Sequence, residues 1–139
     1  MGERLVLDTT VLIAAERGRL NLAAAASDDD DVTLPAIVVA EFLTGVRLAA
    51  TDRQRAARQA FLDRTLHALP IEDYTQRVAE HHATLLAHVR RTGTTRGAHD
   101  LIVAATAAAT GRTILSTDDR ARFSDLPGVA ARNITEMIN

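Results

Sequence analysis

Short apolar stretches alternate along this chain with longer segments whose apolar residues recur at helical spacing. The short stretches predict β-strands over residues 4–7, 32–34, 113–116 and 129–131. The longer segments predict helices over residues 11–17, 20–26, 35–50, 52–69, 73–92 and 98–110, with a further helical turn at the end. Strands that alternate with helices in this way predict an α/β fold of three layers, α-β-α, in which helices flank a short central parallel sheet.

Polar residues, proline and glycine mark the ends of the predicted helices. Thr9 and Thr10 follow the first strand and are typical N-cap residues. Pro35 suits the first turn of a helix, because proline has no N–H to leave unpaired there. Asp52 is expected to cap the helix that follows it. The small and polar residues of 93–97 predict a flexible loop between the last two helices.

Length and composition favour a single globular domain over residues 1–139. Hydrophobic residues make up 47% and charged residues 24%, which is typical of a folded soluble protein. We expect no membrane association and a cytoplasmic location, because there is no apolar run of about 20 residues and no signal-peptide pattern. Cysteine and lysine are absent, which excludes thiolate metal sites, P-loop lysines and Schiff-base lysines.

Acidic residues stand at the ends of two strands and beside the apolar face of two helices. Asp8 follows the first predicted strand, and Asp118 and Asp119 follow the third. In an open parallel sheet, ligands bind beyond the carboxyl ends of neighbouring strands. Glu41 and Asp100 lie among apolar residues of their helices. Because a lone buried carboxylate is costly, these acids are expected to share a hard divalent cation, Mg²⁺ or Mn²⁺.

Most of these acids also have a purely structural interpretation. Asp8, Asp118 or Asp119 can cap a helix, and Asp100 in a first turn can interact favourably with the helix dipole. Glu41 has the weakest interpretation of this kind, since it lies in the middle of its helix. It is therefore the strongest single indication of a site.

Four segments carry a family resemblance: VLDTTVLI at 6–13, PAIVVAEFLTGV at 35–46, AHDLIVAATAAATG at 98–111 and ILSTDDRARF at 114–123. In this order they resemble the PIN domain, and specifically the VapC-like ribonuclease toxins of bacterial toxin–antitoxin pairs. The resemblance implies a PIN-like fold and a metal-dependent endoribonuclease that hydrolyses RNA phosphodiester bonds with one or two Mg²⁺ or Mn²⁺ ions. It also implies a VapB-like antitoxin as partner.

The same resemblance implies the residues of the site. Asp8, Glu41 and Asp100 match three metal-binding and catalytic acids of the family. The fourth is expected at Asp119, two residues after Thr117, with the adjacent Asp118 as the other candidate. The working hypothesis is that Asp8 and Asp100 hold the ion, and that Glu41 and Asp119 complete the site or orient water.

Substrate contacts are expected from hydroxyls and arginines near the acids. The candidate substrate-binding residues are Thr10, Arg96, Thr117 and Arg120. Because the net charge is −2, RNA phosphates must be neutralised by a local arginine cluster. The arginines near the third and fourth acids in sequence are Arg90, Arg91, Arg96, Arg112, Arg120 and Arg122, for which an ordinary solvated surface is the alternative. His99 adjoins Asp100 and is placed to face the same cleft.

Two nearly all-apolar helical stretches, 11–15 and 36–39, offer more apolar surface than one sheet face requires, which predicts a homodimer. Their alternative role is as central core elements. Haloacid-dehalogenase-like phosphatases and response-regulator receivers are excluded by the missing lysine. A non-catalytic PIN-like module that binds RNA or protein stays open as the alternative function, and metal titration separates it from the nuclease.

Overall fold

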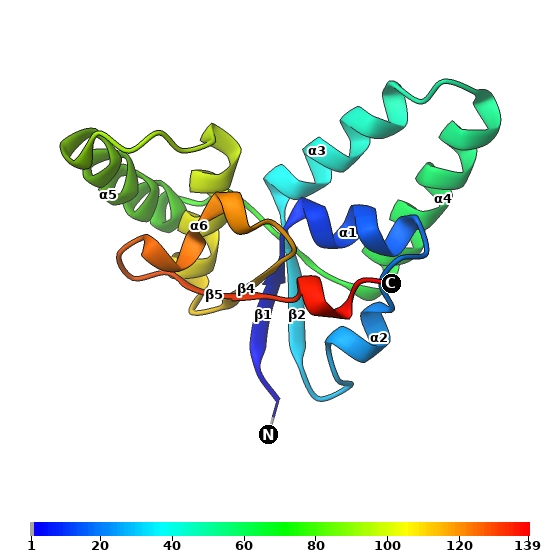
Figure 1. Cartoon of the computed structure of the whole chain (residues 1–139), viewed down its shortest axis with the longest axis horizontal. Coiled ribbons are helices and arrows are strands. Elements are labelled where there is room, and N and C mark those ends of the chain that lie inside the picture. Colours follow the sequence, from blue (N-terminus) through cyan, green and yellow to red (C-terminus); the bar gives the residue numbers. More distant parts are fainter. Residues whose placement is uncertain (1) are drawn as a thin grey trace.

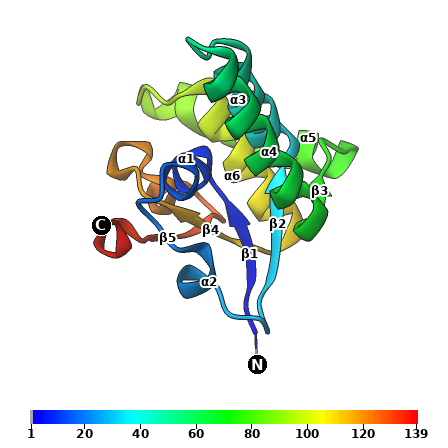
Figure 2. The same cartoon turned by 90° about the vertical axis from the view of Figure 1, so that its right-hand side faces the viewer.

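A computed structural model describes residues 2–139 of the chain and shows a five-stranded parallel sheet between two layers of helices (Figure 1, Figure 2). The strands are β1 (Arg4–Leu7), β2 (Asp31–Pro35), β3 (Ile71–Glu72), β4 (Thr113–Ser116) and β5 (Ala130–Asn133). They lie in the order β3-β2-β1-β4-β5, and every pairing is parallel. The predicted three-layer α/β fold is confirmed.

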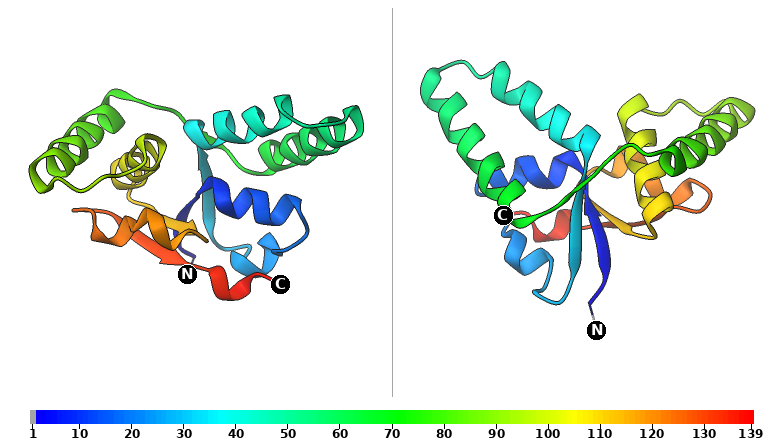
Figure 3. Two further views of the ribbon diagram at one scale, coloured as in Figure 1. Left: turned by 45° about the horizontal axis from the view of Figure 1, so that its top comes forward. Right: turned by 180° about the vertical axis from the view of Figure 1, so that it is seen from behind.

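The helices that connect the strands are divided between the two faces. They are α1 (Thr9–Glu16), α2 (Leu22–Ala25), α3 (Ala36–Arg47), α4 (Asp52–Ala68), α5 (Gln76–Thr92) and α6 (Ala98–Thr110). Single 3₁₀ turns follow as η1 (Asp119–Ala121), η2 (Phe123–Asp125) and η3 (Thr135–Met137). Figure 3 shows α5 and α6 on one side of the sheet and α1, α3 and α4 on the other. No helix within residues 2–139 is long and apolar enough to cross a membrane.

Several helix starts differ from the sequence prediction. Asp8, rather than Thr9 or Thr10, caps α1, because its carboxylate accepts the N–H of Thr9 at 2.7 Å. Thr51, rather than Asp52, caps α4 through its hydroxyl. In each case the capping oxygen lies one or two positions earlier than expected, within reach of the first unpaired N–H groups of the helix.

The edges of the sheet were the least predictable part. Ile71 and Glu72 pair with Leu34 and Pro35 to form β3, so the next helix begins only at Gln76 instead of at residue 73. A strand of two residues has no periodicity by which to be recognised. Likewise, Pro35 ends β2 and stands before α3 instead of within its first turn.

The central strand carries the core and places the first acid. Leu5, Val6 and Leu7 of β1 are fully buried between the two helical layers. Helix α6 is also buried along most of its length, and its alanines allow it to pack closely beside α5 and β4. Because β1 lies between β2 and β4, the residue that follows it, Asp8, stands in the middle of the carboxyl edge of the sheet.

Candidate active site

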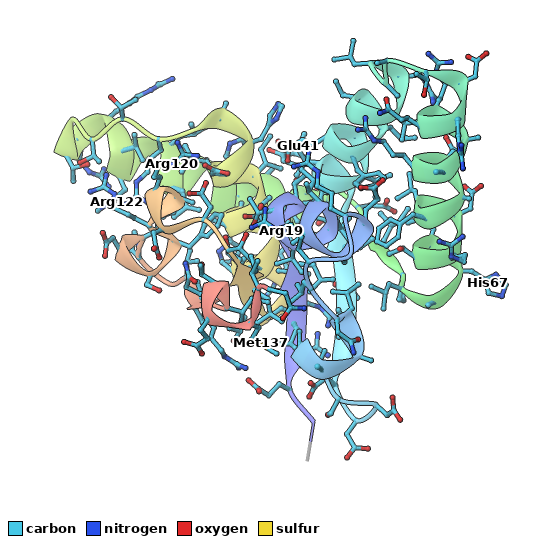
Figure 4. All side chains as sticks on the ribbon, turned by 45° about the vertical axis from the view of Figure 1, so that its right-hand side comes forward. Arg19, Glu41, His67, Arg120, Arg122 and Met137 are labelled. Atoms are coloured by element: carbon cyan, nitrogen blue, oxygen red, sulfur yellow. The ribbon has the colours of Figure 1, made fainter. Side chains whose placement is uncertain are left out.

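The carboxyl ends of β1 and β4 bring the expected acids together. Leu7 and Leu115 are partners across these strands, and the N–H of Asp8 donates to the carbonyl of Leu115 at 3.0 Å. Asp8 and the turn that begins at Ser116 therefore lie at one edge of the sheet. Glu41, labelled in Figure 4, comes from α3 and lies where this helix approaches the first turn of α6.

Asp8 is buried and held by three donors. Its Oδ1 accepts the N–H of Thr9 at 2.7 Å, and its Oδ2 accepts the hydroxyls of Thr10 at 3.1 Å and Ser116 at 2.8 Å. Burial raises the pKa of Asp8 above its usual value, and these hydrogen bonds, which favour the charged form, offset part of that rise. The charge on Glu41 raises it further. The chain thus fixes the orientation of a carboxylate that gains from a nearby cation.

The two hydroxyls on Asp8 also bind the turn after β4. The hydroxyl of Thr10 accepts the N–H of Thr117 at 3.1 Å, and that of Ser116 accepts the N–H of Asp118 at 3.0 Å. Each hydroxyl therefore joins the first acid to the segment that carries the fourth. Sequence reasoning did not single out Ser116, although a hydroxyl at the end of a buried strand, directly before an acidic turn, was a usable signal.

Glu41 is held at both of its oxygens. Its Oε1 accepts the hydroxyl of Thr9 at 2.7 Å, and its Oε2 lies 3.2 Å from Nδ1 of His99. The two contacts come from α1 and α6, so Glu41 joins three helices around the site. The predicted position of His99 facing the acids is confirmed by its contact with Glu41.

Asp100 is the acid whose protonation is most affected by the others. Its half-buried position raises the pKa to about 6, together with the charges of Asp8, Asp118 and Glu41, while His99 acts in the opposite direction. Acids from three other parts of the chain thus raise the pKa of Asp100. Of the predicted acids, Asp8 and Glu41 therefore act on Asp100 through their charges, and so does Asp118, whereas Asp119 does not.

Asp118 and Asp119 have different surroundings. The side chain of Asp118 accepts the N–H of Arg120 at 2.9 Å and caps η1, which confirms the predicted capping role. The charge of Asp118 also raises the pKa of Asp100. Asp119 is exposed, and its Oδ1 accepts the amide of Asn133 on β5 at 2.5 Å.

The candidate arginines occupy unlike positions. Arg120 has a side chain that is 94% exposed beside Asp118, and Figure 4 shows Arg120 and Arg122 on the segment that follows β4. Arg96 donates to backbone carbonyls of the protein. Arg112 is buried at the start of β4, at the opposite end of this strand from the acids. Its expected place in a phosphate-binding cluster was wrong, because nearness in sequence across a strand is not nearness at one edge.

Gly97, which the sequence did not indicate as functional, leaves room for the carboxylate of Asp100 because it has no side chain. A Cβ at this position would stand 2.8 Å from Oδ2 of Asp100. The backbone of Gly97 is extended, with φ −62° and ψ 135°, so alanine is not strained there. The only obstacle to a side chain at this position is the carboxylate itself.

We expect Gly97→Ala to displace the Asp100 carboxylate and to lower kcat for the RNA cleavage that the family resemblance implies by about tenfold to a hundredfold. Thermal unfolding should change little, because the displaced atom is the end of a flexible side chain. Gly45→Ala on α3 is the control, since a Cβ there meets no described atom within 4 Å. Unchanged kcat in Gly97→Ala would show that the position of Asp100 is not critical.

The donor set fits a hard divalent cation. Within residues 2–139, no group of three or more His, Cys, Asp or Glu side chains is gathered closely enough to hold a metal ion by itself. Mg²⁺ requires less than this, because it keeps several water ligands and is bound through one or two carboxylates. The interacting side chains are carboxylates, whose hard oxygens suit Mg²⁺ or Mn²⁺. A cation here also relieves the repulsion that raises the pKa of Asp100.

Comparison with known proteins identifies the family. Residues 5–129 match the PIN domain. Ribonuclease VapC5 of Mycobacterium tuberculosis is 35% identical over 131 residues, which cover 93% of this chain and 92% of that protein. The crystal structure of VapBC-5, a toxin–antitoxin system of the same organism, matches with a TM-score of 0.78 at 29% identity, covering 94% of this chain and 98% of that one.

A second solved structure supports the fold alone. VapBC2 of Rickettsia felis, bound to a DNA fragment from its promoter, matches with a TM-score of 0.81 at 22% identity over 94% of this chain and 98% of that one. The family match includes the positions of Asp8, Glu41, Asp100 and Asp118. The chain therefore belongs to the PIN-domain family and, within it, to the VapC ribonucleases.

Proposed function

We propose that this chain is the toxin of a toxin–antitoxin pair and cleaves RNA by hydrolysis of phosphodiester bonds, with Mg²⁺ or Mn²⁺ held among Asp8, Glu41, Asp100 and Asp118. The observation that carries this proposal is the buried Asp8, fixed by Thr9, Thr10 and Ser116 at the carboxyl edge of the sheet. The charges of Asp8, Glu41 and Asp118 also raise the pKa of Asp100. Asp8 and Asp100 are the residues that would hold the cation.

The residues of the chain prepare the site for hydrolysis. When bound, a divalent cation supplies Lewis-acid activation and neutralises phosphate charge. Thr10 and Ser116 fix the orientation of Asp8. Thr9 and His99 do the same for Glu41, which is thereby placed to orient the attacking water and accept its proton.

RNA contacts are proposed for the exposed residues of the turn after β4. Arg120 offers a solvent-facing guanidinium next to Asp118, where a phosphate of the substrate must lie. Thr117 directly precedes Asp118 in the same turn and is half-buried. Thr10 and Arg96 already donate to groups of the protein, so their proposed contribution is to hold the site in shape.

A VapB-like antitoxin and a second copy of the chain are the proposed protein partners. The antitoxin is supported by the similarity to the VapBC-5 complex. The second copy is supported by an apolar groove of about 270 Å³ lined by Ile37, Ala40 and Ile102, beside the exposed Tyr74. The cytoplasm, where RNA and a newly made antitoxin are both present, is the proposed location.

A non-catalytic PIN-like module that binds RNA or protein is the second candidate. One observation favours it, namely that three metal-ligating side chains are not gathered within residues 2–139. If the chain is such a module, added metal should neither raise its Tm nor produce RNA cleavage. The effect of Mg²⁺ on thermal stability separates the two candidates.

Protons and metal ions are expected to compete at Asp100. Its pKa is raised from 3.8 to about 6, so between these values the folded protein holds a proton that the unfolded chain has lost. This group therefore lowers the stability of the metal-free protein as pH rises through that window, with the full loss above about pH 6. A bound cation compensates for the loss.

We therefore expect added Mg²⁺ to raise the Tm clearly at about pH 7.5 and only slightly at about pH 5. Thermal melts of the wild type and Asp100→Asn, with and without Mg²⁺, measure this effect. The variant should gain little at either pH. A gain of equal size at both pH values, or one retained in the variant, would place the metal elsewhere.

Asp118 and Asp119 are separated by substitutions that keep the cap. Asparagine caps a helix as well as aspartate does, so Asp118→Asn removes charge but not the bond to Arg120. We expect it to lower kcat by at least about tenfold, or 1.4 kcal/mol of barrier, with little change in Tm. Asp119→Asn should lower kcat less. The reverse order would assign the fourth acid to Asp119, as the family resemblance suggests.

A further inference from the structure

The side chain of Arg96 links the loop between α5 and α6 to the turn after β4. Its Nη1 donates to the carbonyl of Ala121 at 2.5 Å and to that of Arg122 at 2.6 Å. These carbonyls stand at the end of η1, and Asp118 caps the start of the same turn. Arg96 and Asp118 therefore hold the two ends of one short element.

This turn has a backbone that benefits from such a contact. Arg122 has φ 44° and ψ 48°, and it is the only residue other than glycine with positive φ between residues 2 and 139. Such a conformation persists only where its surroundings hold it. Ala121 and Phe123 on either side are buried, so loss of the Arg96 contact is expected to loosen the turn without detaching the segment from the core.

The guanidinium of Arg96 is directed into the protein. The residue is half-buried, and its Nε is enclosed without a hydrogen-bond partner in the described part of the chain. Arg120, by contrast, extends into solvent. A phosphate contact therefore suits Arg120 and not Arg96.

We propose that Arg96 is a positioning residue, which fixes the turn over residues 118–122 by binding its last carbonyls and so keeps Asp118 beside Asp100. The role of this turn in catalysis rests on the proposed function. The contact itself belongs to the metal-free chain and is tested without any activity.

Hydrogen exchange of the metal-free protein tests the contact. In Arg96→Gln, backbone amides of residues 119–123 are expected to exchange at least about tenfold faster than in the wild type, while peptides from β1 keep their rates. Arg96→Lys retains a donor and should restore part of the protection. Arg53→Ala, an exposed arginine on α4, is the control. Unchanged exchange in Arg96→Gln would overturn the proposal.

Cleavage kinetics then separate positioning from substrate binding. We expect Arg96→Gln to lower kcat by about tenfold and to raise the Mg²⁺ concentration for half-maximal activity, with KM for RNA unchanged. A phosphate contact would instead raise KM and reduce the salt dependence of RNA binding by about one unit of slope, which would overturn positioning. If the wild type fails to cleave RNA with Mg²⁺, the proposed function falls, and the exchange rates still decide the role of Arg96.

Discussion

Asp8→Asn is expected to reduce RNA cleavage by at least about a thousandfold while leaving the fold intact. Asparagine has the shape of aspartate and still accepts the N–H of Thr9 through its carbonyl oxygen. It lacks the charge that a cation requires. Because burial raises the pKa of Asp8, the charged form is disfavoured in the metal-free protein, and the neutral variant should have a Tm at or above that of the wild type.

Single-turnover cleavage with Mg²⁺ and thermal melts without it measure these two effects. Asp73→Asn, at an exposed position before α5, is the matched control and should change neither quantity. A cleavage rate within about tenfold of the wild type would mean that Asp8 does not hold the metal. A large fall in Tm would mean that its hydrogen bonds with Thr10 and Ser116 serve mainly the fold.

The second large effect is expected on stability, from the buried Arg112. Its side chain is 6% exposed, and it connects the start of β4 to the other strands. Its guanidinium donates to the carbonyl of Asp31 at 2.7 Å, to the carboxylate of Asp31 at 3.2 Å and to that of Glu72 at 3.1 Å. Removing the guanidinium leaves the carbonyl of Asp31 and the partly exposed carboxylates of Asp31 and Glu72 without their charged donor.

We expect Arg112→Leu to lower the free energy of unfolding by about 1–3 kcal/mol, because a buried donor shared by three acceptors is lost while the carboxylates themselves are partly exposed to water. Urea denaturation measures this change. Arg4→Leu is the control, since Arg4 also contacts Asp31 but is half exposed, and its loss should cost about 1 kcal/mol or less. Well below the unfolding transition, kcat should be unchanged, because Arg112 lies at the far end of β4 from the acids. An equal fall in the free energy of unfolding in both variants would show that the burial of Arg112 does not contribute to stability.

The regular part of the fold was predictable because its elements are long or strongly patterned. The strand at 4–7 and the helix at 98–110 have the bounds expected from the sequence. The strand at 71–72 was missed because two residues carry no pattern. The capping residues were misplaced by one or two positions because neighbouring Thr and Asp side chains compete for the same N–H groups.

For the site, the sequence indicated the acids but not what holds them. Asp8 was recognisable at the end of an apolar strand, and Glu41 was recognisable as a charge beside an apolar helix face. Gly97 was not recognisable, because its role depends on how closely the Asp100 carboxylate approaches it in the folded chain. Ser116 was missed in the same way, and Arg96 was expected to contact the substrate, since both act through partners far away in the sequence.

The most direct test of the central claim is RNA cleavage by the purified wild type under control of a divalent metal. We predict cleavage with Mg²⁺ or Mn²⁺, its loss on chelation with EDTA, and its return when excess Mg²⁺ is added, with Asp8→Asn and Asp100→Asn inactive throughout. Cleavage that persists in EDTA, or that survives in these two variants, would contradict a metal-dependent nuclease built on these acids.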